Sequence, residues 1–558
     1  MTISAYLFEV RSIQPFLFAS GKLKHLVAGS ELIDYLCTQP LQEALAVCEL
    51  EGYSSAEHSP RCAGGAFYLL IDDAEKARRF RQLWPLLVHQ LLPGVEQVDA
   101  LVEAPSAKEA IRLGLEQLKE ARNRPSVALP AASPVTQRSP RTGMAAVQQQ
   151  RGESLDEATA VKVAFKRPED YTPLARRFSS HEDVLWPNNF EHDAHPTQRF
   201  PLGEKDCVAM IHIDGNGLGE VLRLVNHIAR DADDKSYVAL YRQFSDGLEQ
   251  ATIDACRQAT DSTLIPEVSA DGVVPARPLV LGGDDVTVLT RGDLGFAFTQ
   301  AFVKAFEDKT RSFLAKLKEQ ASQLDDKEAE KFPQRLTACA GIAFIKPSQP
   351  FSQCYELAES LCDRAKKESR AAKEALGLAE IPSSLAFHRV SASLIEDQEY
   401  LFKREMYVRD SGADKGVPLA LARPAYGLDA TINSSALSQF QDLQQLAECF
   451  GPERLNDKRL RSLATLLHLD RHAAVKDYQR WRDLAQQQAH TRELLAAFDH
   501  HHTRLLGNLD HRLPTSQDGK TSVLADLLAY LGVAGAGVRG QGDKATAVQT
   551  ETAREVVQ

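Results

Sequence analysis

Short apolar runs that end at aspartate or glycine mark the middle of the chain. Residues 207–214 form one such run, which ends at Asp214 and is followed by the turn Gly215-Asn216-Gly217-Leu218-Gly219. Residues 220–228 then repeat apolar positions at the spacing of an amphipathic helix. This order predicts a buried strand, a tight turn and a helix. The first backbone N–H groups of such a helix are free to bind an anion such as phosphate.

A second pattern predicts a β-hairpin at residues 279–290. Two apolar runs flank the sequence Gly282-Gly283-Asp284-Asp285, and glycine enters a tight turn at positive φ with little steric cost. Two adjacent carboxylates on a rigid turn repel each other unless a cation lies between them, and a divalent metal with oxygen ligands is the usual solution. If the hairpin neighbours the strand that ends at Asp214, the three acids predict a two-metal site for phosphoryl transfer.

Each of the two motifs, taken alone, is typical of an ordinary solvated turn, because Gly, Asn and Asp favour turns for their own reasons. Their occurrence together, each at the tip of an apolar strand, favours a functional site.

The N-terminal part of the chain repeats this pattern with different chemistry. Residues 4–36 predict a strand followed by one helix, and residues 62–71 predict a hairpin of the same form. In this hairpin Gly64-Gly65 take the glycine positions, and Ala66-Phe67 are predicted to stand where Asp284-Asp285 stand. The repetition indicates an internal duplication in which one copy has lost its metal ligands.

These motifs resemble the palm domain of the polymerase/cyclase large subunits of type III CRISPR effector complexes, and more distantly the GGDEF diguanylate cyclases. The likeness continues through a predicted strand at residues 336–347 and a predicted helix at residues 355–367, which ends in the Ala365-Lys366 pair that such palms carry. The resemblance implies an α+β fold with two ferredoxin-like palm domains in tandem and a C-terminal helical domain.

The resemblance also implies an activity: a nucleotidyltransferase that condenses ATP into a cyclic oligoadenylate-type second messenger in antiviral defence, with two Mg²⁺ or Mn²⁺ ions as cofactors. Lys366 would neutralise nucleotide phosphate, and the first glycine pair would line an acceptor site. The predicted catalytic residues are Asp214, Asp284 and Asp285, and the predicted metal ligands are Asp214, Ile213, Asp284 and Asp285. The predicted nucleotide-binding residues are Asn216, Gly217, Leu218, Gly282, Gly283, Lys366, Gly64 and Gly65.

Five regions are predicted. They are a degenerate first palm (1–122), a linker or insert (123–204), a catalytic second palm (205–395), a helical domain (396–532) and a tail expected to be disordered (533–558). Because the first palm starts at residue 4, we expect a compact form without a preceding HD nuclease domain, and no cleavage of single-stranded DNA. The helical domain is expected to dock subunits of a guide-RNA complex.

The amino-acid composition limits which binding partners we expect. A net charge of −11 over 558 residues argues against strong binding to free nucleic acid, which requires a basic face. The sequence contains no signal peptide and no apolar stretch of about 18 residues, so we expect a cytoplasmic protein without membrane contact. Nine cysteines without a Cys-x-x-Cys pair are typical of reduced, mostly structural thiols.

Two alternatives to this activity stay open. A non-catalytic, nucleotide-binding scaffold subunit of an RNA-guided complex would keep the fold without turnover, although the three intact acids argue against it. A GGDEF-like cyclase acting on GTP is less favoured, because the two palms within one chain are unlike each other.

Overall fold

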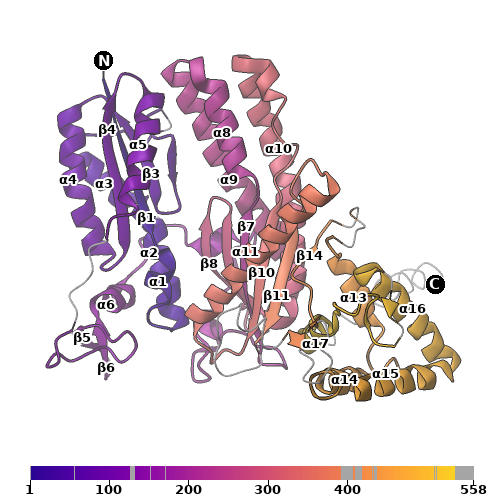
Figure 1. Ribbon diagram of the computed structural model, residues 1–558. Helices are drawn as coiled ribbons and strands as arrows, with labels where there is room; N and C mark the ends of the chain where they lie inside the picture. The colour runs from indigo at the N-terminus through magenta and orange to yellow at the C-terminus, as the bar shows by residue number, and fades with distance from the viewer. Residues whose placement is uncertain are drawn as a thin grey trace, which may run out of the picture.

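Three parts of the molecule lie in a row: an N-terminal sheet with its helices, a larger central sheet, and a group of C-terminal helices (Figure 1). The computed structural model describes residues 2–55, 57–125, 132–150, 152–169, 171–390, 406–408, 418–429, 432, 436–507, 509–510 and 512–534. The predicted disordered tail therefore lies outside the described residues, except for its first two. Within these ranges, none of the helices combines the length and hydrophobicity that crossing a membrane requires.

The N-terminal sheet is antiparallel, with the strand order β2-β3-β1-β4. Side chains of β1 alternate between its two faces, as a strand dictates: Phe8 packs against Trp84 of α4, and Leu7 lies under Gly114 of α5. The strands are β1 (Ile3–Arg11), β2 (Arg61–Ala63), β3 (Ala66–Ile71) and β4 (Glu96–Ala104). The helices are α1 (Ile13–Phe18), α2 (Leu23–Leu36), α3 (Gln39–Val47), α4 (Ala74–Leu91) and α5 (Ala107–Ala121).

The single helix predicted within residues 4–36 is wrong, because the structure has two helices there. The chain leaves α1 at Ala19 and passes through Gly21 at φ +69° before α2 starts at Leu23. A positive φ does not fit a right-handed helix, and glycine adopts it at no steric cost.

The segment predicted as a linker or insert carries its own small elements. They are β5 (Ala146–Gln150), β6 (Glu153–Asp156), α6 (Glu157–Ala164) and α7 (Leu174–Arg177). Lys162 of α6 is buried and donates to the backbone carbonyl of Phe16, and Lys22 pairs with Glu153 at 2.8 Å. The segment is therefore attached to α1 and α2.

The central sheet has six strands in the order β14-β11-β10-β7-β9-β8, and every neighbouring pair is antiparallel except β10–β11. Ile211 and Ile213 of β7 share one hydrophobic cluster with α8, α9 and α10, whereas Met210 shares the other with α11. The strands are β7 (Val208–Gly215), β8 (Ala276–Gly282), β9 (Asp285–Arg291), β10 (Ala338–Ile345), β11 (Ser384–Arg389) and β14 (Tyr426–Gly427). The helices are α8 (Leu218–Ile228), α9 (Asp234–Thr263), α10 (Gly295–Ala329) and α11 (Phe351–Leu376).

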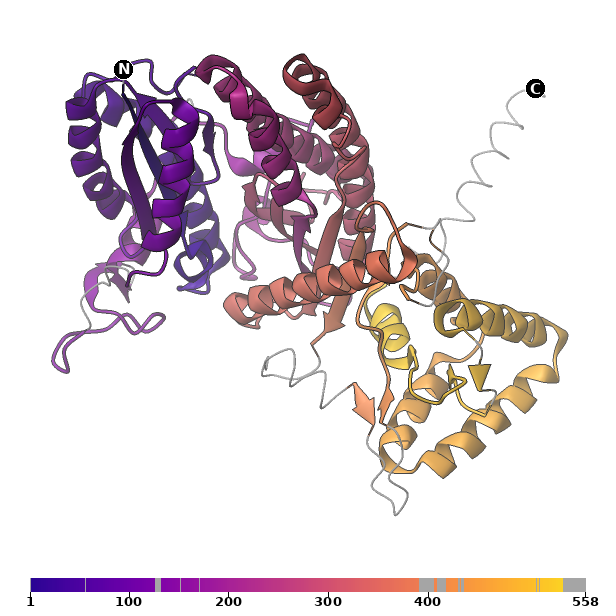
Figure 2. The same ribbon diagram turned by 45° about the horizontal axis from the view of Figure 1, so that its top comes forward.

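The C-terminal part is helical and sits beside the β14 edge of the central sheet (Figure 2). Its helices are α13 (Phe440–Glu448), α14 (Asp457–Leu469), α15 (Arg471–Gln486), α16 (Ala489–Leu506) and α17 (Leu524–Val533). Short strand pairs are β12 (Tyr407–Val408) with β13 (Leu419–Ala420), and β15 (Leu509–Asp510) with β16 (Thr515–Ser516). Short 3₁₀ turns are η1 (Pro196–Gln198), η2 (Ala229–Asp231), η3 (Ile265–Glu267) and η4 (Gly292–Leu294).

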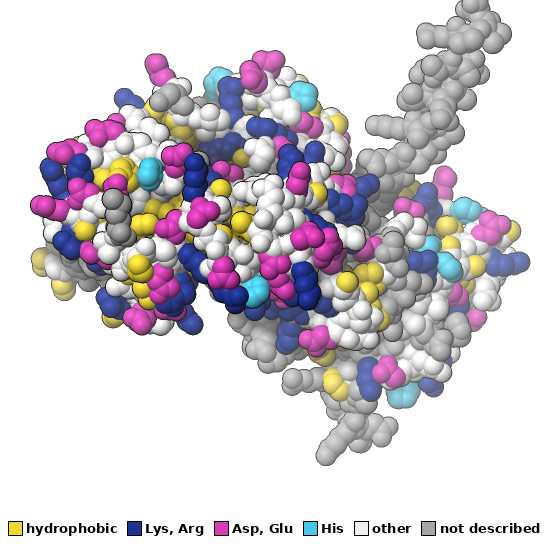
Figure 3. Space-filling view, turned by 90° about the horizontal axis from the view of Figure 1, so that it is seen from above, with side chains coloured by type: hydrophobic (Ala, Val, Ile, Leu, Met, Phe, Trp, Pro, Cys, Tyr) yellow, Lys and Arg dark blue, Asp and Glu magenta, His cyan; other side chains and the backbone are white. Residues whose placement is uncertain are grey.

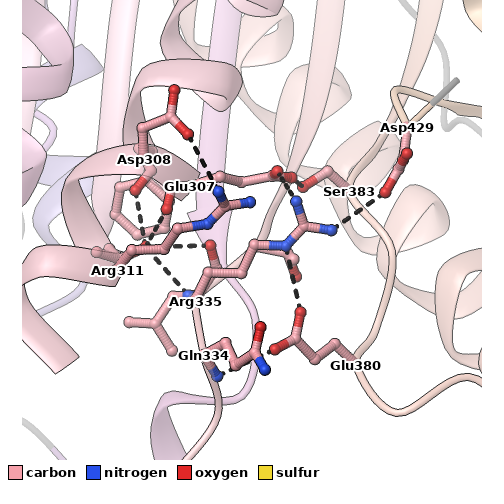
Figure 4. A network of polar contacts seen from close by, with 12 residues as sticks. Glu307, Asp308, Arg311, Gln334, Arg335, Glu380, Ser383 and Asp429 are labelled. Atoms are coloured by element: carbon pink, nitrogen blue, oxygen red, sulfur yellow. Dashed lines mark hydrogen bonds and ion pairs between the residues drawn. The ribbon is translucent and has the colours of Figure 1, made fainter. Parts of the chain in front are cut away.

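Two polar anchors join the central sheet to the chain that follows it. Asp526 of α17 is buried and accepts hydrogen bonds from Tyr426 Oη and from the backbone N–H of Arg423. Arg335 binds three carboxylates at once, those of Glu307 (2.7 Å), Glu380 (3.2 Å) and Asp429 (3.1 Å), as Figure 4 shows. The α+β architecture with tandem palms and a helical C-terminal part is confirmed.

Candidate active site between the two palms

The sheet register brings the two sequence motifs together. Strand β7 lies between β9 and β10, and its last pair with β9 is Ile213 with Val286. Continuing this register by one residue sets Asp214 opposite Asp285. Gly282 pairs with Asp285 across a two-residue turn, in which Gly283 adopts φ +64°. The strand tip and the hairpin are therefore neighbours, as the sequence predicts.

Asp214 and Asp284 meet above the backbone of Gly215. Their carboxyl groups share a hydrogen bond. A Cβ on Gly215 would lie 3.0 Å from both Cβ and Oδ2 of Asp284, so only glycine leaves room for this approach. Burial raises the pKa of Asp284 to about 7, and the charge of Asp214 adds to that effect. Burial likewise raises the pKa of Asp285 to about 8, again with the charge of Asp214 second.

One oxygen of this cluster has no hydrogen-bond partner among the described residues. Asp285 Oδ1 is buried, and His212 Nδ1, which lies 3.4 Å from it, is engaged by Thr287 Oγ1 at 3.1 Å. Burial also lowers the pKa of His212, which keeps the ring neutral. An unpaired carboxylate oxygen beside two further acids favours a cation, and an all-oxygen donor set suits Mg²⁺ or Mn²⁺.

Lys366 is the cation that the structure places on these acids. Its ammonium group, on α11, forms an ion pair with Asp214. Burial opposes the charge of Lys366, but the hydrogen bond and charge of Asp214 outweigh burial and raise its pKa. Across the described residues, no group of three or more His, Cys, Asp or Glu side chains is arranged to hold a metal ion. Lys366 already compensates part of the negative charge of this cluster, through one oxygen of Asp214.

The predicted phosphate cradle is the start of α8. Gly217 caps the helix at φ +80°, and the backbone N–H groups of Leu218 and Gly219 belong to its first turn, which has no intrahelical partners. Asn216 was predicted to bind nucleotide, but its side chain is buried and donates to Thr337 Oγ1 at 3.1 Å. Its backbone N–H also donates to the Thr337 carbonyl oxygen, at 2.8 Å. Asn216 therefore joins the turn to the start of β10, and it can offer a ligand only its backbone carbonyl oxygen. Ile213 is buried and apolar, so it too can offer only a backbone oxygen.

A cavity of about 290 Å³ lies in front of the acids, with walls from both palms. The two glycine hairpins touch at its edge, since a Cβ on Gly64 would lie 3.5 Å from the Cα of Gly282. Its lining includes Ile33, Asp34 and Gly64 from the first palm and Gly282, Asp284 and Asp285 from the second.

Helix α9 contributes residues to this cavity that sequence reasoning missed. Ser245 and Glu249 are one helical turn apart and line it beside the apolar side chains of Phe244 and Leu248. Neither polar side chain has a hydrogen-bond partner among the described residues, and burial raises the pKa of Glu249. Nothing in the local sequence of α9 could reveal this, because only tertiary packing brings the helix to the hairpins.

The first hairpin is aligned differently from the prediction. Ala63 pairs with Ala66, so its two-residue turn consists of Gly64 and Gly65. Gly65 and Ala66 therefore stand where Asp284 and Asp285 stand, and the predicted match of those acids with Ala66 and Phe67 is wrong by one residue. Phe67 instead lies in the core, stacked on Phe8 at 5.3 Å.

The first palm retains one acid that the sequence reasoning overlooked. Glu9 of β1 pairs in register with Ala66, which is the place that Asp214 takes opposite Asp285. Its carboxylate binds Arg122 and accepts from Tyr68 Oη at 3.0 Å. Arg122 and Lys366 follow the first residue of α5 and α11 by the same number of positions. The Glu9–Arg122 pair is thus the counterpart of the Asp214–Lys366 pair.

Two facing palms, one with acids at its strand tip and hairpin, make this a tandem-palm protein. Residues 207–376 match the family model described as the second palm domain of Cas10/Cmr2. Over these residues the chain is similar to that palm domain, which confirms the resemblance seen in the sequence.

Solved structures of Csm1 share low sequence identity with the chain. The Csm1–Csm4 cassette in complex with cA4 is 12% identical, over 96% of this chain and 70% of that chain, with a TM-score of 0.48. The same cassette in complex with one ATP is 12% identical, over 95% of this chain and 70% of that chain, with a TM-score of 0.48. Csm1 of T. onnurineus is 13% identical, over 95% of this chain and 69% of that chain, with a TM-score of 0.44. No curated protein sequence matches the chain.

Proposed function

We propose that the chain is a metal-dependent nucleotidyltransferase that condenses ATP into a cyclic oligoadenylate-type product, as a subunit of a type III CRISPR-like defence complex. The observation that carries this proposal is the cluster of Asp214, Asp284 and Asp285 at the edge of a cavity that both palms enclose. A reaction that joins two nucleotides needs one site for the donor phosphate and a second for the attacking hydroxyl, and two facing palms offer both.

The acids would hold the metal ions. Asp214 and Asp285 are the proposed shared ligands, and Asp284 is a ligand or a proton carrier. Two bound Mg²⁺ or Mn²⁺ ions supply activation of a hydroxyl and neutralisation of the charge that develops at phosphorus. Lys366, released from Asp214, would neutralise the triphosphate, which the backbone N–H groups at the start of α8 would orient.

The apolar wall with Ser245 and Glu249 would receive a nucleobase. Its leucine and phenylalanine side chains bury a flat ring, while the two polar groups face hydrogen-bonding atoms on the base edge. Gly64 and Gly65 bring the first hairpin within contact of the second, so the acceptor nucleotide would lie against the first palm. Subunits of the complex are proposed to dock on the helical C-terminal part.

The proposal is tested by incubating the purified chain with ATP or GTP and Mg²⁺ or Mn²⁺, alone and in the complex isolated from its native cell, and resolving the products by mass spectrometry. An oligoadenylate that disappears with Asp284→Asn/Asp285→Asn, but persists with the exposed control Asp271→Asn, supports it. ATP binding without any product in the isolated complex would contradict it and favour the scaffold alternative.

A further inference from the structure

Two cysteine thiols meet beneath the hairpin of the first palm. Cys37 ends α2 and Cys62 lies in β2, 25 positions apart along the chain. Their thiol groups share a hydrogen bond, and Cys62 Sγ also lies 3.6 Å from the backbone carbonyl oxygen of Cys37. Both residues are half-buried and reduced, so a small oxidant can reach them.

The contact has the chemical asymmetry of an attacking and a resolving thiol. The hydrogen bond between them is the largest cause that lowers the pKa of Cys62; burial opposes it, and the nearby charge of Arg242 assists it. The same hydrogen bond, together with burial, raises the pKa of Cys37. The thiolate is the reactive form of cysteine, so oxidation starts at the thiol with the lower pKa.

We propose that Cys37 and Cys62 form a redox site in which a peroxide converts the two thiols into a disulfide. The Cys62 thiol gives up its proton, and the resulting thiolate attacks one oxygen of hydrogen peroxide. The O–O bond breaks, a sulfenic acid forms, and the leaving hydroxide takes up that proton as the first water. The Cys37 thiol then attacks the Cys62 sulfur and releases a second water. Two thiols are oxidised and one peroxide is reduced, with two waters as the other products. A thiol reductant reverses the bond by exchange.

This disulfide would join two elements that line the cavity between the palms. Ile33 and Asp34, one turn before Cys37, line the cavity, and so does Gly64, two residues after Cys62. Ile33 also packs against Gly65, whose Cβ would lie 3.2 Å from Ile33 Cγ2. A bond between α2 and β2 therefore ties together two of the elements with which the first palm lines the cavity. The redox site stands independently of the proposed function, whereas its effect on nucleotides rests on that function.

The first test maps disulfides in the full chain after exposure to hydrogen peroxide, by mass spectrometry of unreduced peptides. A Cys37–Cys62 peptide pair is expected in the wild type and in Cys207→Ser. It should be absent in Cys62→Ser and after reduction. Cys207 is a matched control, since it is also half-buried but burial raises its pKa to about 11. Sulfinic acid at either position without a cross-link would overturn the proposal, as would random pairing in the folded chain.

The second test compares ATP binding, with Mg²⁺ present, between oxidised and reduced protein by titration calorimetry. We expect oxidation to change the affinity by about fivefold or more, the lower limit of typical coupling between sites, and Cys62→Ser to be insensitive. A disulfide that forms without altering affinity would overturn the regulatory part alone. Failure of the chain to make any product would count against the proposed function, while the peptide map would still decide the redox site.

Discussion

Each palm has its own sheet, a glycine hairpin and an acid–cation pair at the strand tip, but the two palms differ in the hairpin turn. The second palm carries Asp284 and Asp285 there, and the first carries Gly65 and Ala66. In the first palm the strand-tip acid, Glu9, pairs with Arg122 and accepts a hydrogen bond from Tyr68. In the second, one lysine pairs with Asp214 beside two further acids, and an Asp285 oxygen has no hydrogen-bond partner among the described residues.

The duplicated palms therefore differ in local charge: at the first hairpin one acid is paired with one cation, and at the second the acids outnumber the cation. An acid matched by one cation stabilises a fold, whereas three acids around one lysine cost stability and favour an added cation. Figure 3 shows that charged side chains of both signs are otherwise intermixed over the upper face of the molecule. The excess of acid over basic side chains at the second hairpin can be tested at that site.

The largest expected effect follows from removing the hairpin acids. Asp284→Asn/Asp285→Asn keeps the side-chain shape but abolishes the metal ligands, so product formation should fall by about 100-fold or more. Because the substitution also removes mutual repulsion, the metal-free protein should melt at a higher temperature than the wild type. Product analysis and thermal melting check the two effects. Wild-type synthesis by this variant would contradict the distinction between the palms.

A matched pair of glycine substitutions tests how tightly each palm packs its last helix. A Cβ on Gly341 of β10 would lie 1.9 Å from the carbonyl oxygen of Ala358 and 2.4 Å from the nitrogen of Cys362, both backbone atoms of α11. Gly341→Ala should therefore displace α11 and cost about 3 kcal/mol in the free energy of unfolding.

Gly114→Ala is the counterpart in the first palm. Its Cβ would meet only the Leu7 side chain, at 2.7 Å, which can rotate, and alanine favours a helix by about 1 kcal/mol over glycine. We expect a change within about 1 kcal/mol. Urea unfolding of both variants measures the contrast, and equal losses would show that the two palms pack alike.

The two acid–cation pairs should respond differently to loss of the cation. Lys366→Gln removes the charge proposed to neutralise triphosphate, so synthesis should fall about tenfold, the cost of one charge-assisted hydrogen bond. Arg122 is 44% exposed, and Arg122→Gln should cost less than about 1 kcal/mol of stability without changing product yield. Steady-state rates and melting curves distinguish them. A loss of synthesis in Arg122→Gln that equals the Lys366→Gln loss would refute separate roles.

The smallest effect expected is a pH dependence that belongs to the second palm alone. Asp284 and Asp285 have folded-state pKa values raised to about 7 and about 8, above the unfolded value of about 4. Groups with raised pKa values contribute stability that is fully present below pH 4 and is lost as the pH rises through 7 to 8. The melting temperature without metal should therefore decline between about pH 4 and about pH 8. Mg²⁺ or the double Asn variant should remove the decline.

The sequence predicts the parts of the site that depend on local signals. The strand-turn-helix at Asp214 and the hairpin at Gly282-Gly283 were predictable because apolar runs and paired glycines specify them within a few residues. The register of the first hairpin was not, since three small residues around Gly64 allow a shift by one residue at little cost. Glu9 was missed because a single acid on a strand is typical of a solvated face, and Ser245 and Glu249 because tertiary packing alone brings α9 to the cavity.

One contact across the palms has a consequence for how the chain can be divided. Glu31 of α2 and Arg277 of β8 are only 2% and 4% exposed and pair at 3.1 Å. Burial lowers the pKa of Arg277 to about 10, which is still high enough to keep it charged. Breaking such a buried pair costs about 3–5 kcal/mol. Glu31 also pairs with Arg167, so the first half keeps a partner for this acid when it is expressed alone. The second half, expressed alone, carries Arg277 without its carboxylate. The second palm therefore depends on the first to compensate this charge, whereas the first does not depend on the second in the same way.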